Sequence, residues 1–258
     1  MTVYIFDLDG VVYRGHDPVP GAAEAIAALR ARGHTVTFAT NNSTRTRAEF
    51  AAKLSGMGVP ATPTEVMTSS YATAHYLLHA ARPAGNLLVL GESGLHQELA
   101  EAGLSPVHDP DRETDYVVVG LDRQFSYARL ALAQTAVLAG ATLIATNRDP
   151  QFPSEGGRLT PGAGSIVAAV ETACRQPALS IGKPEPHLFT ALLDKLGTPF
   201  AEVIVVGDNL LTDIGAAARL GCYSVLVLTG VSTRDDIATS AAKPDLVIET
   251  LEGLLADG

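Results

Sequence analysis

The sequence predicts an α/β fold with a doubly wound parallel sheet, into which a second, smaller α/β unit is inserted. Short apolar runs alternate along the chain with longer helical patterns, which is the order that parallel sheets covered by helices require. Some of these runs, such as Val203–Val206, are apolar at every position and therefore predict strands buried on both faces. The 258 residues suffice for one large domain or two smaller ones.

The composition indicates a globular protein and argues against two classes of partner. The chain is 47% hydrophobic and 18% charged, and its formal net charge is -10 with no basic run, which disfavours nucleic acid polymers and anionic membranes. No segment has the pattern of a membrane span or a secretory signal, and Cys174 and Cys222 lack zinc-site spacing. We therefore expect a cytoplasmic protein with reduced cysteines.

The opening strand begins at Val3 and is predicted to end on two acids. Asp7 and Asp9 are one residue apart, and Gly10 allows a sharp turn after them. Ligands gather at the carboxyl ends of strands in open α/β sheets, so both carboxylates are candidates for chemistry. Two adjacent acids repel each other unless a proton or a cation lies between them, and Mg²⁺ suits a few oxygen ligands. A solvated turn or part of a calcium loop would account for the same residues.

Polar residues also follow the second predicted strand, which covers 35–39. They are Thr40, Asn41, Asn42 and Ser43. Ser43 or Thr44 can cap the helix that follows, which leaves Thr40 and the neighbouring amides able to receive an anion. Capping alone would also explain this segment.

The remaining elements continue the alternation of strands and helices. Helices are predicted over 22–32, from the cap through 56, from 69 through 81, and over 93–102, 126–139, 165–174 and 185–196. Further strands are predicted over 65–68, 87–90, near 105–107, and over 116–119, 142–145, 203–206, 224–228 and 246–248. A turn at 83–85 and a polar segment that begins at 180 mark two boundaries. They predict a core made of 1–81 and 180–258, with 82–179 as the inserted unit.

Three strand ends and one turn carry the reactive side chains. Thr40 follows the second strand, Asp208 and Asp213 follow the strand at 203–206, and Lys183 lies in a turn between a glycine and a proline. The carboxyl ends of parallel strands share one edge, so these residues can converge on the acids of the first strand. There a carboxylate can attack phosphorus, a metal, a lysine and a hydroxyl can hold the phosphoryl group, and a second acid can transfer protons.

Four short motifs in this order resemble those of the haloacid dehalogenase (HAD) superfamily. They are Asp7-Leu8-Asp9-Gly10, Thr40-Asn41, Gly182-Lys183-Pro184 and Gly207-Asp208-Asn209-Leu210-Leu211-Thr212-Asp213. The inserted unit falls between the second and third motifs, so the chain is similar to the class IIA capped subfamily of NagD-like and para-nitrophenyl phosphatase-like enzymes. This resemblance covers nearly the full length and implies a Rossmann-like core with an α/β cap of the C2 type.

The resemblance implies a role for each motif residue. Asp7 would be the nucleophile that forms an aspartyl-phosphate, and Asp9 would be the general acid and base. Thr40 and Lys183 would hold the phosphoryl group. Mg²⁺ would be bound by the Asp7 carboxylate, the Asp9 backbone carbonyl and Asp208.

Four further residues would support this site by the same resemblance. Asn41 and Asn42 would line the phosphate end. Asn209 and Asp213 would contact the metal ligands without binding the metal themselves. Asp213 would orient Lys183 or a metal-bound water.

The cap of the resembled enzymes covers the reaction site, so its loop over 147–165 should approach the leaving group. Arg148, Phe152 and Arg158 are candidates for that contact, although arginines in polar loops more often lie in solvent. Some pyridoxal-phosphate phosphatases of the group have histidine where Phe152 falls, which argues against pyridoxal phosphate as the preferred substrate. Members of the group often pair through their caps, which favours a homodimer.

We therefore expect a Mg²⁺-dependent phosphomonoesterase. Its substrates would be small phosphorylated metabolites such as nucleoside monophosphates, sugar phosphates, phosphoglycolate or aryl phosphates. A mutase or phosphotransferase would use the same covalent intermediate, and a receiver-type signalling module would also use clustered acids, a hydroxyl and a lysine. Such a module needs a single domain of about 100 residues, so the inserted unit argues against it.

Overall fold

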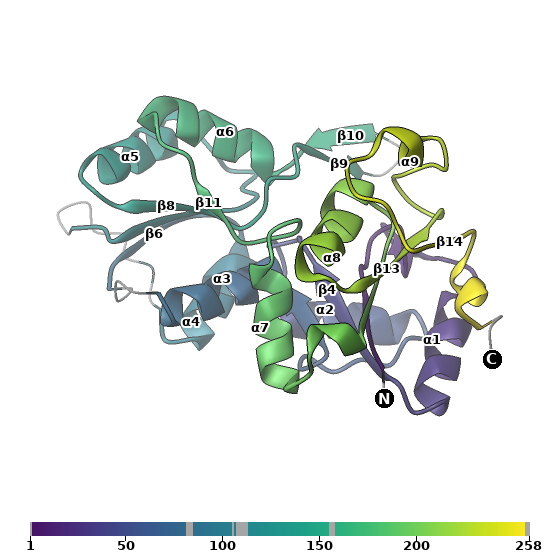
Figure 1. Cartoon of the computed structure of the whole chain (residues 1–258). Coiled ribbons are helices and arrows are strands. Elements are labelled where there is room, and N and C mark those ends of the chain that lie inside the picture. The colour runs from purple at the N-terminus through teal and green to yellow at the C-terminus, as the bar shows by residue number, and fades with distance from the viewer. Residues whose placement is uncertain (1, 81–84, 105, 107–112, 155–157, 256–258) are drawn as a thin grey trace. The chain divides into compact units, whose positions relative to one another are not determined.

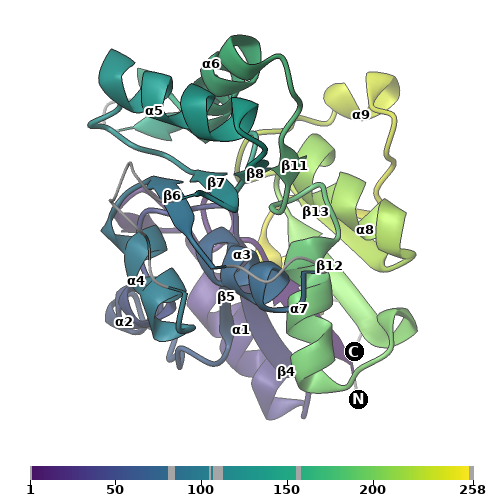
Figure 2. The ribbon, with the colours of Figure 1, turned by 90° about the vertical axis from the view of Figure 1, so that its left-hand side faces the viewer.

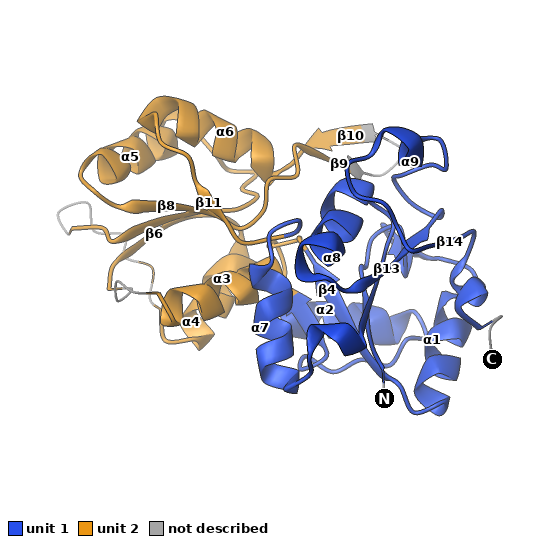
Figure 3. Cartoon of the chain, in the orientation of Figure 1, with its two compact units in different colours: residues 1–40, 47–67, 183–258 blue, residues 41–46, 68–182 orange. Residues whose placement is uncertain are grey.

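The computed structural model describes residues 2–80, 85–104, 106, 113–154 and 158–255, and Figure 1 shows its ribbon with many of the elements labelled. The predicted α/β class is confirmed, because the structure has two sheets of parallel strands accompanied by helices. The chain divides into two compact units, coloured in Figure 3: the first comprises 1–40, 47–67 and 183–258, and the second 41–46 and 68–182.

A six-stranded sheet in the order β14-β13-β12-β1-β4-β5 forms the centre of the first unit. Its strands are β1 (Val3–Phe6), β4 (Thr35–Thr40), β5 (Val66–Thr68), β12 (Val203–Gly207), β13 (Tyr223–Val227) and β14 (Leu246–Ile248). β1 is parallel to both neighbours, and Phe6 lies opposite Val206 of β12 and Phe38 of β4. The residues that follow these three positions therefore emerge at one edge of the sheet.

Apolar side chains cover both faces of this sheet. On one face, Ile26 of α1 (Ala22–Ala31) and Phe50 of α2 (Arg47–Gly56) belong to the same buried cluster as Phe6. On the other, Leu210 and Ile214 pack with Leu226, whose chain neighbour in β13 faces the first cluster. The other helical segments of this unit are α7 (His187–Leu196), 200–202, 210–214, α8 (Gly215–Leu220), α9 (Asp236–Thr239) and 251–255.

A short hairpin after β1 was not predicted. Its strands, β2 (Tyr13–Arg14) and β3 (Asp17–Pro18), are antiparallel. The Gly10 N–H donates to the Tyr13 carbonyl at 2.7 Å, so the hairpin returns to the turn that carries Asp9. Strands of two residues are too short to show an alternating pattern, so no pattern of residues predicts them.

The second unit is built on a four-stranded parallel sheet in the order β11-β8-β7-β6. Figure 2 shows α5 and α6 over one face of this sheet and α3 and α4 below the other. The strands are β6 (Leu87–Leu90), β7 (Tyr116–Val119), β8 (Thr142–Ala145) and β11 (Leu179–Ser180), and the helices are α3 (Ser69–Leu78), α4 (Ser93–Glu101), α5 (Tyr127–Leu138) and α6 (Ala163–Cys174). An antiparallel hairpin of β9 (Gln151–Ser154) and β10 (Arg158–Pro161) precedes α6.

Several elements differ from the prediction. α2 begins at Arg47, so the predicted capping by Ser43 or Thr44 is wrong; the Asn42 side chain instead accepts the Thr44 N–H at 2.8 Å in a turn. The short strands β9, β10 and β11 were not predicted. The strand predicted near 105–107 lies outside the described residues except for Pro106, which bridges to Leu87.

The grouping of α3 also differs from the predicted boundaries at 81/82 and 179/180. α3 joins the second unit because it packs along α4, and its Ser69 hydroxyl donates to the Asn41 carbonyl at 2.7 Å. The compact units place α3 with the second unit, whereas the sequence placed it in the core. The division into a core of 1–81 and 180–258 and an inserted unit of 82–179 stays a prediction. Within the described ranges, the structure contains no helix with the length and apolar surface needed to cross a membrane.

Candidate active site

The sheet register brings three acids together in the first unit. Asp7 follows β1, and its backbone N–H donates to the Val206 carbonyl at 2.9 Å, which extends the pairing with β12 by one residue. Asp208 is the second residue after Val206, and Asp213 lies in the turn that follows. Carboxylate oxygens of Asp7, Asp208 and Asp213 lie within 4.8 Å of one another.

Lys183 supplies a positive charge within this acidic cluster. Its Nζ donates to Asp7 Oδ1 at 2.5 Å, to Asp213 Oδ1 at 2.7 Å and to the Ala39 carbonyl at 3.1 Å. The side chain is only 3% exposed, so the ammonium depends on these partners instead of water. Burial lowers the pKa of Lys183, but the carboxylates of Asp213 and Asp7 outweigh burial, so the pKa is raised and the lysine stays charged.

The pKa values of two acids show that the fold disfavours their full ionisation. Burial raises the pKa of Asp7 to about 7, against the attraction of Lys183. Burial and repulsion from Asp7 raise the pKa of Asp208 well above its usual range, although the Val231 N–H donates to its Oδ2 at 2.7 Å. Three carboxylates with one ammonium therefore leave an excess of negative charge that a cation would relieve.

The donor set fits Mg²⁺, which binds carboxylate and carbonyl oxygens. Both oxygens of Asp213 already accept hydrogen bonds, Oδ1 from Lys183 and Oδ2 from the Asn209 N–H at 3.1 Å. Asp7 and Asp208 are therefore the carboxylates that would hold the ion, with the Asp9 carbonyl as the predicted third ligand. Asp213 holds Lys183 in place.

The turn after β1 carries Asp9, and the next residue, Gly10, packs against the Asp208 carboxylate. Gly10 has a φ of 87°, which favours glycine, and a Cβ there would overlap the Asp208 carboxylate. The Asp9 side chain is exposed, yet the surrounding protein desolvates its carboxylate enough to raise the pKa, while Lys53 opposes the rise. A carboxyl group with a raised pKa suits proton donation and acceptance.

Lys53 is a neighbour of this turn that sequence reasoning missed. It belongs to α2, and its Nζ lies 3.3 Å from the centre of the Tyr13 ring. It is also close enough to lower the pKa of Asp9. A single lysine on a helix gives no sequence signal, because most such lysines lie in solvent.

Comparisons with known proteins show the family to which this chain belongs. Residues 4–105 match the family model of haloacid dehalogenase-like hydrolases, and residues 180–254 match a model described as HAD-hydrolase-like. An acid sugar phosphatase of Staphylococcus aureus is 40% identical over 254 residues, which are 98% of this chain and 96% of the relative. The chain belongs to the haloacid dehalogenase-like hydrolase family. The resemblance inferred from its four motifs is therefore confirmed.

Solved structures share the fold of this HAD-like hydrolase over nearly its whole length. A p-nitrophenyl phosphatase from Archaeoglobus fulgidus has a TM-score of 0.91 at 36% identity, with 98% of each chain covered. A glycerol phosphate phosphatase from Mycobacterium tuberculosis, solved in complex with magnesium, has a TM-score of 0.90 at 37% identity and covers 98% of this chain and 76% of its own.

The predicted phosphate-binding residues of this HAD-like hydrolase fall in both units. Thr40 ends β4 in the first unit, is 6% exposed, and follows Ala39, whose carbonyl accepts from Lys183. Asn41 belongs to the second unit, where its Nδ2 donates to Asp149 Oδ2 at 3.1 Å. The Asn42 side chain accepts in the turn described above. Contact of Thr40, Asn41 and Asn42 with phosphate stays a prediction.

Asn209 acts as a local cap in this structure. Its Oδ1 accepts the Leu211 N–H at 2.9 Å and the Thr212 N–H at 3.4 Å, at the start of the helical turn 210–214. The same turn carries Asp213. Asn209 therefore fixes the path of the chain between Asp208 and Asp213.

The three candidates for substrate contact lie in the second unit. Arg148 is ion-paired with Glu171 at 2.6 Å and donates to the Ala178 carbonyl at 2.8 Å, so its described contacts are local. Phe152 is half-buried and lies 5.9 Å from the Arg123 guanidinium. The Arg158 side chain lies outside what the structure describes. Substrate contact stays a prediction for all three.

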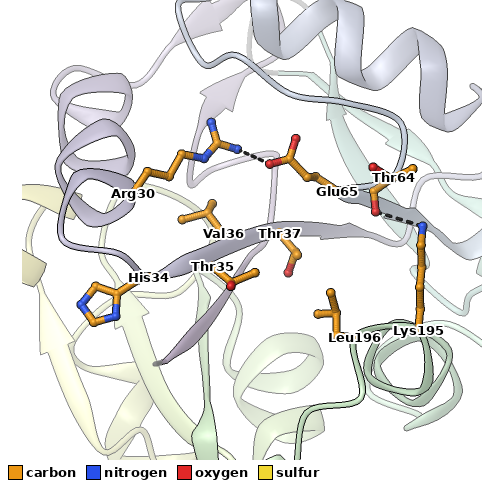
Figure 4. Close-up of a pocket in the computed structure, with 9 residues that line it drawn as sticks. All are labelled: Arg30, His34, Thr35, Val36, Thr37, Thr64, Glu65, Lys195 and Leu196. Carbon is orange, nitrogen blue, oxygen red and sulfur yellow. Dashed lines mark hydrogen bonds and ion pairs between the residues drawn. The ribbon is translucent and has the colours of Figure 1, made fainter.

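A separate hollow of about 440 Å³ lies at the other end of β4 (Figure 4). Thr35 and Thr37 form part of its lining, and Arg30 pairs with Glu65 across it at 2.9 Å. Thr35 is five residues before Thr40, which corresponds to about 16 Å along a strand. Its lining includes no member of the acidic cluster, so we do not assign the reaction to this hollow.

The rise in melting temperature caused by Mg²⁺ is expected to be larger at about pH 8 than at about pH 5. The pKa of Asp7 is raised to about 7, so the folded protein keeps protons that the unfolded chain has released. The protonated Asp7 therefore favours the folded state. This stabilisation is complete below the pKa that Asp7 has in the unfolded chain, and it is lost as the pH rises through about 7. Mg²⁺ competes with those protons and compensates for the loss.

The measurement is differential scanning fluorimetry at both pH values, with millimolar Mg²⁺ or a chelator. Asp208→Ala is the control, since it removes one of the two carboxylates available to the ion and should abolish the upshift. Upshifts of equal size at both pH values would contradict this prediction.

Proposed function

We propose that this HAD-like hydrolase is a Mg²⁺-dependent phosphomonoesterase that acts on small phosphorylated metabolites. The observation that carries the proposal is the position of Asp7, whose carboxylate is held by buried Lys183 and lies beside Asp208 at the end of β1. A nucleophile that attacks an anionic phosphate needs a fixed orientation and positive charge nearby, and this arrangement supports both.

The residues of the first unit suffice for a balanced two-step reaction. In the first step a carboxylate oxygen of Asp7 attacks phosphorus, the bond from phosphorus to the ester oxygen breaks, and Asp9 gives its proton to the departing alcohol. In the second step Asp9 takes a proton from water, the water oxygen attacks the phosphorus of the aspartyl-phosphate, and orthophosphate leaves as the Asp7 carboxylate is restored. Asp9 therefore acts first as an acid and then as a base.

Lys183, together with Mg²⁺ when it is bound, would balance the charge on the transferred group. Lys183 cannot move into water, because its ammonium is bound to Asp7, Asp213 and the Ala39 carbonyl, so it offers its charge without reorganisation. The Thr40 hydroxyl would hold a phosphoryl oxygen at the end of β4. Mg²⁺, when bound by Asp7, Asp208 and the Asp9 carbonyl, would neutralise the phosphate oxygens.

The substrate class rests on the relatives. Their names specify sugar phosphates, p-nitrophenyl phosphate and glycerol phosphate, which share a monoester on a small leaving group. We propose the same class here, with nucleoside monophosphates and phosphoglycolate as further members. Pairing of two chains through the second unit also stays a prediction, and sedimentation would test it.

The test is a panel of phosphorylated metabolites with p-nitrophenyl phosphate as reference, scored by release of orthophosphate with Mg²⁺ and with a chelator. We expect hydrolysis that the chelator abolishes. A phosphorylated second product without accumulation of orthophosphate would show transfer instead of hydrolysis. A stable phosphorylated protein without turnover would favour a signalling role.

A further inference from the structure

The segment Thr229–Ser232, directly after β13, contacts the acidic cluster although it belongs to none of the four motifs. β13 ends at Val227 and is paired with β12, so its continuation emerges at the same edge of the sheet as Asp208. The Val231 N–H donates to Asp208 Oδ2 at 2.7 Å, and the Ser232 N–H donates to the Asp208 carbonyl at 2.9 Å. Both the side chain and the backbone of Asp208 are therefore held by this segment.

Two glycines close around the same carboxylate from different strand ends. A Cβ on Gly230 would overlap Oδ2 and Cγ of Asp208, and a Cβ on Gly10 would overlap the same two atoms. The Asp208 carboxylate thus occupies the space that side chains would take at both positions. A side chain at either position would therefore collide with the Asp208 carboxylate as it now lies.

Thr229 links these two strand ends directly. Its hydroxyl is buried and donates to the Gly10 carbonyl at 2.6 Å, while its own carbonyl accepts from Arg14 Nε of β2 at 2.6 Å. Gly10 is the residue after Asp9, whose carbonyl is a predicted metal ligand. One side chain therefore ties the turn that carries Asp9 to the segment that orients Asp208.

We propose that Thr229–Ser232 is the positioning segment of the metal site, in which Thr229 and Gly230 set the separation between the Asp9 turn and the Asp208 carboxylate. The inference rests on the proposed Mg²⁺ site. Mg²⁺ requires nearly ideal octahedral geometry, so a shift of either ligand by a fraction of an ångström weakens binding. Residues that orient metal ligands typically change metal affinity by about 10- to 100-fold when they are replaced.

The test is the Mg²⁺ affinity of purified protein without substrate, measured by isothermal titration calorimetry and by the Mg²⁺ dependence of the melting temperature. Thr229→Val keeps the shape of the side chain but removes the donor to Gly10, and it is expected to weaken Mg²⁺ binding by about tenfold or more. Gly230→Ala should weaken it further, because the added methyl group displaces the Asp208 carboxylate.

Two variants serve as controls. Thr229→Ser retains the hydroxyl and should restore Mg²⁺ binding to within about threefold of wild type. Thr233→Val makes the same chemical change four residues away, where the exposed hydroxyl donates to Asp236 Oδ2 at 2.7 Å, and it should leave Mg²⁺ binding unchanged. If Thr229 contributed only to stability, Thr229→Val would melt at a lower temperature in chelator, but its Mg²⁺ affinity would equal that of Thr229→Ser.

The outcomes separate this inference from the proposed function. If wild type binds no Mg²⁺ and hydrolyses no phosphate ester, the proposed function fails. If wild type binds Mg²⁺ and Thr229→Val binds it equally well, the positioning segment is refuted while the function stands. Should Gly230→Ala fail to fold, the comparison of valine and serine at 229 decides alone.

Discussion

Asp7→Asn is expected to lower kcat by at least about 10⁴-fold and to leave the protein folded. The amide has no carboxylate oxygen with which to attack phosphorus, so the covalent intermediate cannot form. Because the fold raises the pKa of Asp7 to about 7, it penalises the charge that this substitution removes. The metal-free variant should therefore melt at the same temperature as wild type or higher at neutral pH.

The measurement is hydrolysis of p-nitrophenyl phosphate with Mg²⁺, together with melting curves in chelator. Asp17→Asn is the matched control, since it removes the same charge from an exposed position in β3 and should keep kcat unchanged. Full activity in Asp7→Asn would end the assignment of the nucleophile. An inactive variant that is also unfolded would not support it, which is why the melting curve is required.

Lys183→Met is expected to cost about 3 to 5 kcal/mol of stability in chelator, in addition to its loss of activity. The ammonium is 3% exposed and is bound to Asp7 and Asp213, so its removal leaves two carboxylates in the interior without their cation. From the sequence alone we would expect the loss to fall mainly on phosphate affinity. Because the structure shows that Lys183 is buried, we expect a loss of stability as well.

Mg²⁺ should recover part of the stability of Lys183→Met, because it supplies positive charge to Asp7. Urea unfolding with chelator and with Mg²⁺ measures this recovery, and inhibition by orthophosphate measures the lost phosphate affinity. Lys195→Met is the control: this exposed lysine donates to the Thr64 carbonyl, and its loss should cost less than about 1 kcal/mol. If Lys183→Met unfolded at the same urea concentration as wild type and were inhibited equally by orthophosphate, the proposed charge balance between Lys183 and the carboxylates would be contradicted.

The alternation of apolar runs and helical patterns was sufficient to predict the main sheet elements. The strands at 87–90, 116–119, 142–145 and 246–248 have the predicted bounds, because buried parallel strands are apolar at nearly every position. The hairpins β2/β3 and β9/β10 were missed because strands of two to four residues with polar members show no clear period. The start of α2 was misplaced because the polar segment 41–46 offers several capping residues.

The chemical types of the site could also be inferred before any coordinates, because parallel strands place their carboxyl ends on one edge. Asp7, Thr40 and Asp208 all follow apolar strands, and Lys183 stands between a glycine and a proline. Thr229 follows a strand in the same way and was overlooked, since its neighbours are not acidic. Lys53 had no signal, because only packing of α2 brings it to Tyr13.

The sequence by itself determined the fold class, the family and the identity of the acids, because these follow from the order and the type of residues along the chain. Tertiary structure alone decided how the charges are divided: Lys183 bonds to Asp7 and Asp213, whereas Asp208 is held by the backbone after β13. The reason is physical, since pKa values and metal affinity depend on burial and on distances of a few ångströms, and such distances arise only when strands remote in sequence are paired.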